Sequence, residues 1–384
     1  MIVMYIMHSA PGAETVIDGR SYLYFIGTGY LGLQGHRAVI RAACAALEKY
    51  GVHSATTRRA FGNQQIVLDV ERQAAEYFGA EDGFYYISGY QGNSTLLGAL
   101  QANFDRVLVD EQAHYSVTAA IQLAGLKSTP FRHCDVADLT EQLRTHLAAG
   151  EKPIVMTDGV FPVSGDIAPL AKYVEVLAAY DGAAISVDDA HGVGVLGERG
   201  RGCWEYAGLD GPWVNALPNA ELPAAAPGVR LYTCGTLSKA FGGSGGIICG
   251  SRDFVAALKA GSRYYDAASA PAAPVAGASL AGLQLAGQGE LRASLARNVV
   301  RFKTGLRRLG FDVADTPVPY VGLVAGDAAN MQRIQHALMD HGIAVAYLAT
   351  YSSVGPQGAL RIAVFATHTE AMIDRLLENL AAVL

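Results

Sequence analysis

Short, almost wholly apolar runs alternate along this chain with longer stretches whose apolar residues recur at helical spacing. The runs show little apolar–polar alternation, which is typical of strands that helices bury on both faces. We therefore predict an α/β fold with a mainly parallel sheet. The predicted strands are Phe84–Ser88, Arg106–Asp110, Pro153–Thr157, Ala183–Asp188, Leu231–Thr236 and Gly246–Gly250. The predicted helices are Ile66–Phe78, Gln91–Asn103, Ser116–Ala124, Leu139–Ala149 and Leu170–Tyr180.

The last third of the chain repeats this alternation on a smaller scale. One long helical stretch, Pro274–Leu309, has the length to join two domains. Beyond it we predict strands at Phe311–Ala314, Tyr320–Ala325, Ala344–Ala349 and Leu360–Phe365, and helices at Ala329–Asp340 and Glu370–Leu384. The pattern predicts an N-terminal segment (1–42), a large α/β domain (43–260), and a linker helix with a small C-terminal domain (261–384).

Composition and charge exclude several classes of protein. Apolar residues make up 51% of the 384 and charged residues 17%, which indicates a folded chain with a large core. The net charge of −6 argues against nucleic acid or an anionic membrane as the main partner. We also expect no membrane span, no secretory signal, and no disulfide framework from five scattered cysteines. These features together predict a cytoplasmic protein.

Three short motifs suggest other chemistries but lie in the wrong context. The segment Gly192–Gly197 fits G-x-G-x-x-G, yet turn residues follow it where a dinucleotide site needs a helix. The segment Gly242–Gly246 fits G-x-S-x-G, yet it runs into a predicted strand where a hydrolase needs a helix. Asp188, Asp189 and His191 lack further ligands nearby for a metal ion. We therefore predict no metal, no dinucleotide and no serine nucleophile.

Reactive side chains and glycine-rich turns instead follow the carboxyl ends of four predicted strands, where open α/β sheets bind their ligands. They are Ser88–Asn93, His114, Asp188–His191 and Thr236–Lys239. Taken singly, each has an ordinary structural explanation. Together they supply a lysine for an aldehyde, an aspartate for a pyridine nitrogen, an imidazole to stack on a ring, and a turn for a phosphate. This combination predicts pyridoxal 5′-phosphate as the cofactor.

Seven sequence blocks, in this order and spacing, resemble the α-oxoamine synthases. The blocks are Tyr30–Leu33, Ser88–Asn93, Asp110–His114, Thr157–Leu170, Val187–Gly202, Gly235–Gly246 and Leu360–Thr369. This family of fold-type I pyridoxal-phosphate enzymes belongs to the class I/II aminotransferase group, and includes 8-amino-7-oxononanoate synthases and 2-amino-3-ketobutyrate CoA ligases. The resemblance runs from about Asp18 to Leu384.

The resemblance implies a role for each matching residue. Lys239 would bind the cofactor aldehyde, Asp188 the pyridine nitrogen and His191 the phenolic oxygen, and His114 would stack on the ring. The remaining implied contacts are Gly89, Tyr90 and Thr236 to the phosphate, Asn93 in the pocket wall, and Arg361 and Thr28 to the substrate. For Arg361, a structural ion pair with a nearby carboxylate is the alternative.

The resemblance also implies a homodimer with its sites at the subunit interface. The implied reaction condenses a small amino acid with an acyl thioester, on coenzyme A or a carrier, and releases CO2 to leave an α-amino ketone. The chain departs from the family pattern at Thr28, Pro162, Ala267 and Ala268. Because these positions face the substrates, transamination or another pyridoxal-phosphate reaction on the same fold is the alternative.

Overall fold

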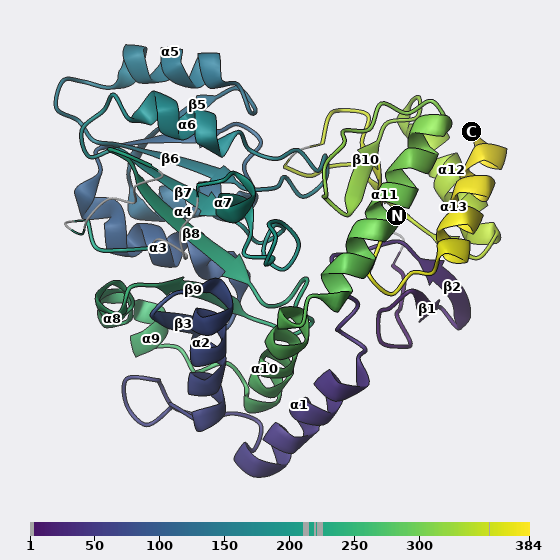
Figure 1. Ribbon diagram of the computed structural model, residues 1–384, viewed down its shortest axis with the longest axis horizontal. Coiled ribbons are helices and arrows are strands. Elements are labelled where there is room, and N and C mark those ends of the chain that lie inside the picture. The colour runs from purple at the N-terminus through teal and green to yellow at the C-terminus, as the bar shows by residue number, and fades with distance from the viewer. Residues whose placement is uncertain (1–3, 210–214, 219, 221–225, 353) are drawn as a thin grey trace.

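The structure, a computed structural model, describes residues 4–209, 215–218, 220, 226–352 and 354–384. Its centre is a seven-stranded sheet in the order β3-β9-β8-β7-β6-β4-β5 (Figure 1). Strands β4 to β8 are parallel, and β9 is antiparallel to both of its neighbours. The strands are β3 (Asp82–Tyr86), β4 (Arg106–Asp110), β5 (Lys127–Phe131), β6 (Pro153–Asp158), β7 (Ala184–Asp188), β8 (Arg230–Thr236) and β9 (Gly246–Gly250).

Both faces of this sheet are buried, as the unbroken apolar runs predict. In β6, Ile154 and Met156 belong to one hydrophobic core and Val155 to the other. Burying each such side chain contributes roughly 1.5–3 kcal/mol. The first core is completed by α3 (Gly92–Leu100), α4 (Tyr115–Ala124) and α8 (Arg252–Gly261). The second is completed by α2 (Gln65–Phe78), α5 (Val136–His146) and α6 (Leu170–Leu177), and α10 (Ala273–Gly287) packs on α2.

A smaller sheet domain combines the two ends of the chain, which lie side by side in Figure 1. Strands β1 (Glu14–Ile17) and β2 (Arg20–Tyr24) form one sheet with β11 (Ile343–Ala344). The other sheet comprises β10 (Tyr320–Leu323), β13 (Ala359–Ala363) and β12 (Ala346–Leu348). The helices here are α11 (Glu290–Arg308), α12 (Ala328–Asp340) and α13 (Glu370–Val383). Three further helices are α1 (Arg37–Tyr50), α7 (Cys203–Tyr206) and α9 (Arg263–Asp266).

The structure corrects some predicted elements. The single helix predicted over 274–309 is two helices, α10 and α11, because Gly289 between them has a φ of +83°. The strand predicted at Phe311–Ala314 is wrong, since this segment is irregular and the Phe311 amide closes the end of α11 onto Leu306. Strands β1, β2 and β5 were not predicted. The domain boundaries at residues 42 and 260 stay predictions, and α1 spans the first of them.

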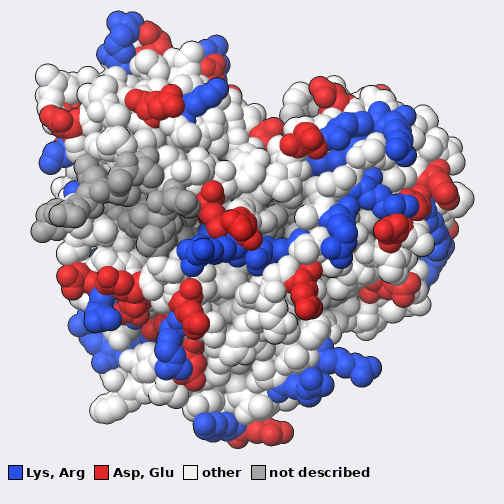
Figure 2. Space-filling model, viewed as in Figure 1, with Lys and Arg blue, Asp and Glu red and all other residues white. Residues whose placement is uncertain are grey.

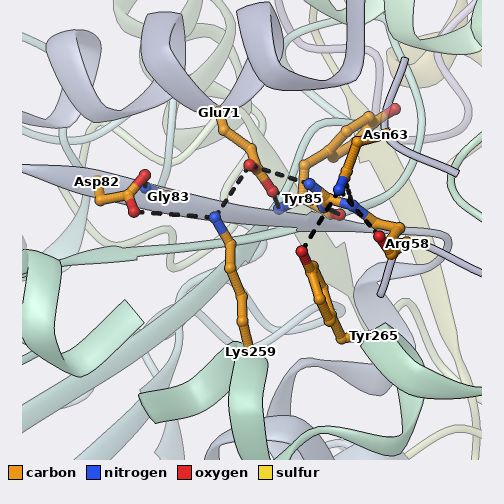
Figure 3. Close-up of polar contacts among 8 residues, drawn as sticks. All are labelled: Arg58, Asn63, Glu71, Asp82, Gly83, Tyr85, Lys259 and Tyr265. Carbon is orange, nitrogen blue, oxygen red and sulfur yellow. Dashed lines mark hydrogen bonds and ion pairs between the residues drawn. The ribbon is translucent and has the colours of Figure 1, made fainter. Parts of the chain in front are cut away.

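A buried ionic cluster joins α2 to the sheet (Figure 3). Glu71 accepts hydrogen bonds from Arg58 Nη1 (2.6 Å) and Nη2 (3.1 Å), from Lys259 Nζ (3.0 Å) and from the Tyr85 amide (2.9 Å). Arg58 also donates to Asn63 Oδ1 at 2.8 Å. One carboxylate therefore ties the loop that carries Arg58 and Asn63 to β3 and α8.

The charged side chains on the face drawn in Figure 2 are of both signs and are interspersed over both lobes of the molecule. Among the residues that the structure describes, no helix is both long enough and apolar enough to cross a membrane.

Candidate active site

A cavity of about 230 Å³ opens where β4, β6, β7 and β8 end. Seven of the ten predicted site residues lie on its wall, together with Asp158 of β6. The turn Ser88–Tyr90 faces the end of β8 across this cavity. The residues that line it are Ser88, Gly89, Tyr90, His114, Ser116, Asp158, Asp188, Ala190, His191, Thr236, Ser238, Lys239 and Tyr351. The structure therefore brings together most of the residues that the sequence selected from four separate strand ends.

Asp188 is the buried carboxylate at the end of β7. Its Oδ2 accepts hydrogen bonds from Asn93 Nδ2 (2.7 Å) and Ser116 Oγ (3.2 Å), and its Oδ1 accepts one from the Ala190 amide (3.1 Å). Asn93 is itself fully buried on α3 and holds the carboxylate from behind the cavity wall. An ionised carboxylate so placed is costly unless it meets a cation or a further donor. Asp188 therefore suits a protonated ring nitrogen.

His114 caps the N-terminus of α4 and is held on three sides. Its amide donates to Asp158 Oδ2 (2.7 Å), its Nδ1 lies 2.8 Å from Ser116 Oγ, and its Nε2 lies 3.1 Å from the Tyr351 hydroxyl. Burial lowers the pKa of His114, while the charge of Asp188 raises it, and the net shift is downward. A neutral imidazole in this fixed orientation can stack on an aromatic ring.

Lys239 lies in the loop between β8 and β9. The loop is closed by the Leu237 amide, which donates to the Gly245 carbonyl, and by Gln34 Nε2, which donates to the carbonyl of Lys239 at 2.6 Å. The lysine Nζ lies 2.9 Å from His191 Nε2. Burial lowers the pKa of Lys239, against the opposing charges of Asp188 and Asp158. A lysine of lowered pKa is the kind that reacts with carbonyl groups at neutral pH.

The turn Ser88–Tyr90 and the end of β8 form a polar rim. A Cβ added at Gly89 would lie 2.7 Å from Thr236 Oγ1, so only glycine allows this close approach. Thr236 Oγ1 in turn lies 2.7 Å from Ser238 Oγ. Hydroxyls and helix-terminal amides are suitable phosphate ligands. The cavity therefore offers an amine, a carboxylate, an imidazole and a phosphate cradle, a donor set that fits pyridoxal phosphate.

The structure places Arg361 and Thr28 off this wall. Arg361 donates to the carbonyls of Pro162 (2.7 Å) and Gly27 (2.8 Å) and to the Tyr30 hydroxyl (3.2 Å). In the described part of the chain no carboxylate lies within ion-pair distance of it, so the structural ion pair given as the alternative is wrong. Thr28 lines a neighbouring cavity of about 190 Å³. Their roles toward a substrate stay predictions.

Sequence reasoning missed four polar residues that surround these groups. Asp158 is paired in register with Asp188 on the next strand, and burial together with that neighbouring charge raises the pKa of Asp158 well above its ordinary value. Its position at the end of an apolar strand was a usable signal. Tyr30 opens one of the seven blocks that resemble the family, but nothing in the sequence indicated its contact with His191. Ser116 and Tyr351 gave no signal, because only the tertiary structure brings them to the site.

Of the two adjacent aspartates, only Asp188 faces the cavity. Asp189 accepts from the amide and the thiol of Cys203, both at 2.8 Å, and points away from Asp188 into the core. Turns and bends run from residue 190 to residue 200, so the residues after the glycine segment 192–197 do not form the helix that a dinucleotide site needs.

Comparison with known proteins identifies the family. A family model described as "Aminotransferase class I and II" matches residues 28–380. The 8-amino-7-oxononanoate synthase of Thioalkalivibrio sulfidiphilus is 33% identical over 96% of this chain and 89% of its own length. That of Methylococcus capsulatus is 34% identical over 98% and 92%. Among solved structures, the serine palmitoyltransferase of Sphingomonas wittichii superposes with a TM-score of 0.88 at 26% identity, covering 99% and 91%.

Fold and site together define a fold-type I, pyridoxal-phosphate-dependent transferase. The chain belongs to the aminotransferase class I and II family, and within it to the α-oxoamine synthases. Enzymes of this type join an amino acid to an acyl thioester, and the alternative of transamination is not favoured. The predicted fold class and cofactor are thereby confirmed.

Proposed function

We propose that the cavity bounded by Lys239 and Asp188 is the active site. There a small amino acid and an acyl thioester, on coenzyme A or a carrier protein, condense to an α-amino ketone with release of CO2 and the free thiol. The observation that carries this proposal is the convergence of a buried amine of lowered pKa and a buried carboxylate on one small cavity with a phosphate cradle.

When bound, pyridoxal phosphate supplies an electron sink that stabilises negative charge at the α-carbon of an amino acid. Asp188 would hold the ring nitrogen in its protonated form, supported by Asn93. His191 would bind the phenolic oxygen and His114 would cover one face of the ring. Lys239 Nζ, whose pKa burial lowers, would take the proton from the α-carbon of the amino acid and return it.

Arg361 is proposed to bind the carboxylate of the amino acid. A guanidinium has five N–H donors, and three of them are used within the chain. One N–H on each terminal nitrogen is left, which is the two-pronged arrangement that a carboxylate takes. Replacing Arg361 by Lys keeps the charge but loses this geometry. We expect the affinity for the amino acid to fall about ten- to a hundredfold, from about 1.5–3 kcal/mol of charge-assisted bonding.

Borohydride trapping followed by peptide mapping tests the site. Reduction should fix the cofactor on Lys239. Lys303 provides a matched control, because it is also buried, and burial lowers its pKa to about 8, but its amine donates to Thr316 and lies outside the cavity. Label on Lys303, or on no lysine, would remove the proposed site. Product analysis tests the reaction: CO2 and free thiol from amino acid plus acyl thioester support it, and pyridoxamine phosphate from amino acid alone supports transamination.

We further propose a cytoplasmic homodimer. Large apolar side chains are exposed around the cavity mouth and on the adjoining helices, namely Ile87, Tyr90, Tyr115 and Leu123, and Phe61 is 93% exposed. Exposed apolar groups gathered near a site are typical of an interface. Analytical ultracentrifugation should give a dimer that Leu123→Glu weakens. Val300→Glu, at a similarly exposed apolar residue on α11 in the other lobe, is the control. A monomeric wild type, or equal effects of the two changes, would contradict the proposal.

A further inference from the structure

A line of hydrogen-bonded side chains runs from the smaller sheet domain to the reactive amine. Arg361 of β13 donates to the Tyr30 hydroxyl at 3.2 Å. The same hydroxyl lies 2.6 Å from His191 Nδ1, and His191 Nε2 lies 2.9 Å from Lys239 Nζ. Arg361, Tyr30 and His191 are all buried. Buried donors of this kind are almost always paired with an acceptor, so the Tyr30 proton needs one among its neighbours.

The chemistry of the first member sets the order of the protons when Tyr30 donates to His191. A guanidinium can only donate, so it takes a lone pair of the Tyr30 oxygen. The Tyr30 hydrogen is then free for His191 Nδ1, and the 2.6 Å separation marks a strong hydrogen bond there. A ring nitrogen that accepts carries no proton, so the neutral imidazole is protonated at Nε2. That N–H can donate to Lys239 only if the amine has a free lone pair.

A second hydroxyl, that of Tyr320, lies near Tyr30. Tyr320 stacks on the Tyr30 ring at 5.7 Å, and its own hydroxyl donates to the Phe161 carbonyl at 2.9 Å. Its oxygen could take the Tyr30 proton, which would free His191 to adopt the other tautomer. Tyr320 is therefore the residue that a test must separate from Tyr30.

The electrostatic environment agrees with the proton order. Burial lowers the pKa of His191 well below its ordinary value, and the charges of Lys239, Arg361 and His114 act in the same direction. For Lys239, burial is again the largest effect and lowers the pKa, as does Arg361, while Asp188, Asp158 and Cys234 oppose it. A neutral imidazole beside a neutral amine satisfies both groups.

We propose that Tyr30 and Arg361 are positioning residues that keep the proton of His191 on Nε2 and so hold Lys239 as a free amine. This inference rests on the proposed function only in taking Lys239 as the lysine that binds the cofactor. In that reaction the Nζ lone pair forms a bond to the aldehyde carbon, and the aldehyde oxygen leaves as water with the two amine protons. A protonated Lys239 has no lone pair to begin it.

The decisive variant is Tyr30→Phe, which removes the hydroxyl and keeps the ring. The rate at which cofactor-free protein binds pyridoxal phosphate is followed by visible absorbance across the pH range. We expect the midpoint of the pH profile to move upward in Tyr30→Phe, and the rate on its acidic side to fall about three- to tenfold, the equivalent of one lost hydrogen bond. Tyr320→Phe removes the neighbouring hydroxyl from the same stack and should leave the midpoint in place. An unmoved midpoint in Tyr30→Phe, or an equal shift in Tyr320→Phe, overturns the proposal.

A second measurement is independent of the cofactor and of any change at Tyr30. Nitrogen NMR of the cofactor-free wild type with isotope-labelled histidine, assigned with His191→Asn, reads the tautomer directly. We expect His191 to be protonated at Nε2 and bare at Nδ1, and the opposite tautomer overturns the proposal. If borohydride labels a lysine other than Lys239 while His191 shows the expected tautomer, the proposed function fails and the proton order stands.

Discussion

Two adjacent aspartates at the end of β7 give the sharpest test of the site, because they face opposite ways. Asp188 lines the cavity and accepts from Asn93 and Ser116. Asp189 is fully buried and accepts from the amide and thiol of Cys203. Changing each to Asn keeps its size and removes its charge. The two substitutions should therefore affect different properties of the protein.

In Asp188→Asn the loss should appear in cofactor binding. A hydrogen bond between charged groups contributes about 1.5–3 kcal/mol, which corresponds to an affinity for pyridoxal phosphate about 10- to 150-fold weaker. In Asp189→Asn the amide nitrogen cannot accept, so one of the two buried Cys203 donors loses its partner, at a cost of about 1–3 kcal/mol in stability. Cofactor affinity should then change little.

The assay combines an equilibrium titration with pyridoxal phosphate, read by visible absorbance, with thermal melts of the cofactor-free proteins. Asp188→Asn should bind weakly, and because the acceptor it gives up serves the part-buried Ala190 amide beside the cavity, its melting temperature should fall less than that of Asp189→Asn. Asp189→Asn should bind normally and melt earlier. Equal losses of affinity in both variants would refute the assignment of Asp188. So would a melting temperature of Asp188→Asn that falls as far as that of Asp189→Asn.

Three other expectations concern stability. Glu71→Gln leaves the buried Arg58 without its anion and takes from Lys259 the closer of its two carboxylates, so it should cost about 3–5 kcal/mol in denaturant unfolding. Asp69→Asn, in an exposed pair on the same helix, should cost less than about 0.5 kcal/mol. Burial lowers the pKa of His368 to about 4. Between about pH 6.5 and pH 4 the unfolded chain therefore binds a proton that the folded chain does not, and the free energy of unfolding falls as the pH is lowered through that range. Melts of His368→Gln at about pH 7 and about pH 5 should show a smaller drop than the wild type. A methyl group at Gly282 would lie 1.8 Å from the Phe241 carbonyl oxygen. Gly282→Ala should therefore lower the melting temperature, although alanine favours helices more than glycine does. An unchanged melting temperature would contradict this close packing.

The central sheet was predictable because its strands are read from their own residues. β6 and β7 are apolar throughout, and their burial on both faces requires this. β5, with the sequence KSTPF, is an edge strand with mostly exposed residues. A search for unbroken apolar runs therefore does not detect it. β1 and β2 also lack a strong strand pattern in their own residues. The sheet that contains them is completed by β11, near the opposite end of the chain, so no local pattern predicts it.

The candidate site divides in the same way. Lys239 follows a predicted strand and His114 precedes a predicted helix, and the reactive side chain of each can be read from the sequence. The link from Tyr30 to His191 spans 161 residues, and no local pattern encodes a hydrogen bond at that separation. Tyr351 reaches His114 from a loop across 237 residues. Motifs thus indicated which groups react, and only the fold shows which groups orient them.

The pairing of β2 with β11 has a consequence for the order in which the molecule is completed. Arg20, the first residue of β2, donates a hydrogen bond to a carbonyl 320 residues further along the chain, and Leu23 pairs with Ile343. A chain emerges from the ribosome N-terminus first, so β1 and β2 are made before every strand of the central sheet and meet their partner after all of them. A two-stranded hairpin is marginal in water by itself, and these strands therefore become ordered late. Tyr30 follows directly after them, so the polar line that reaches Lys239 closes only when nearly the whole polypeptide has been synthesised.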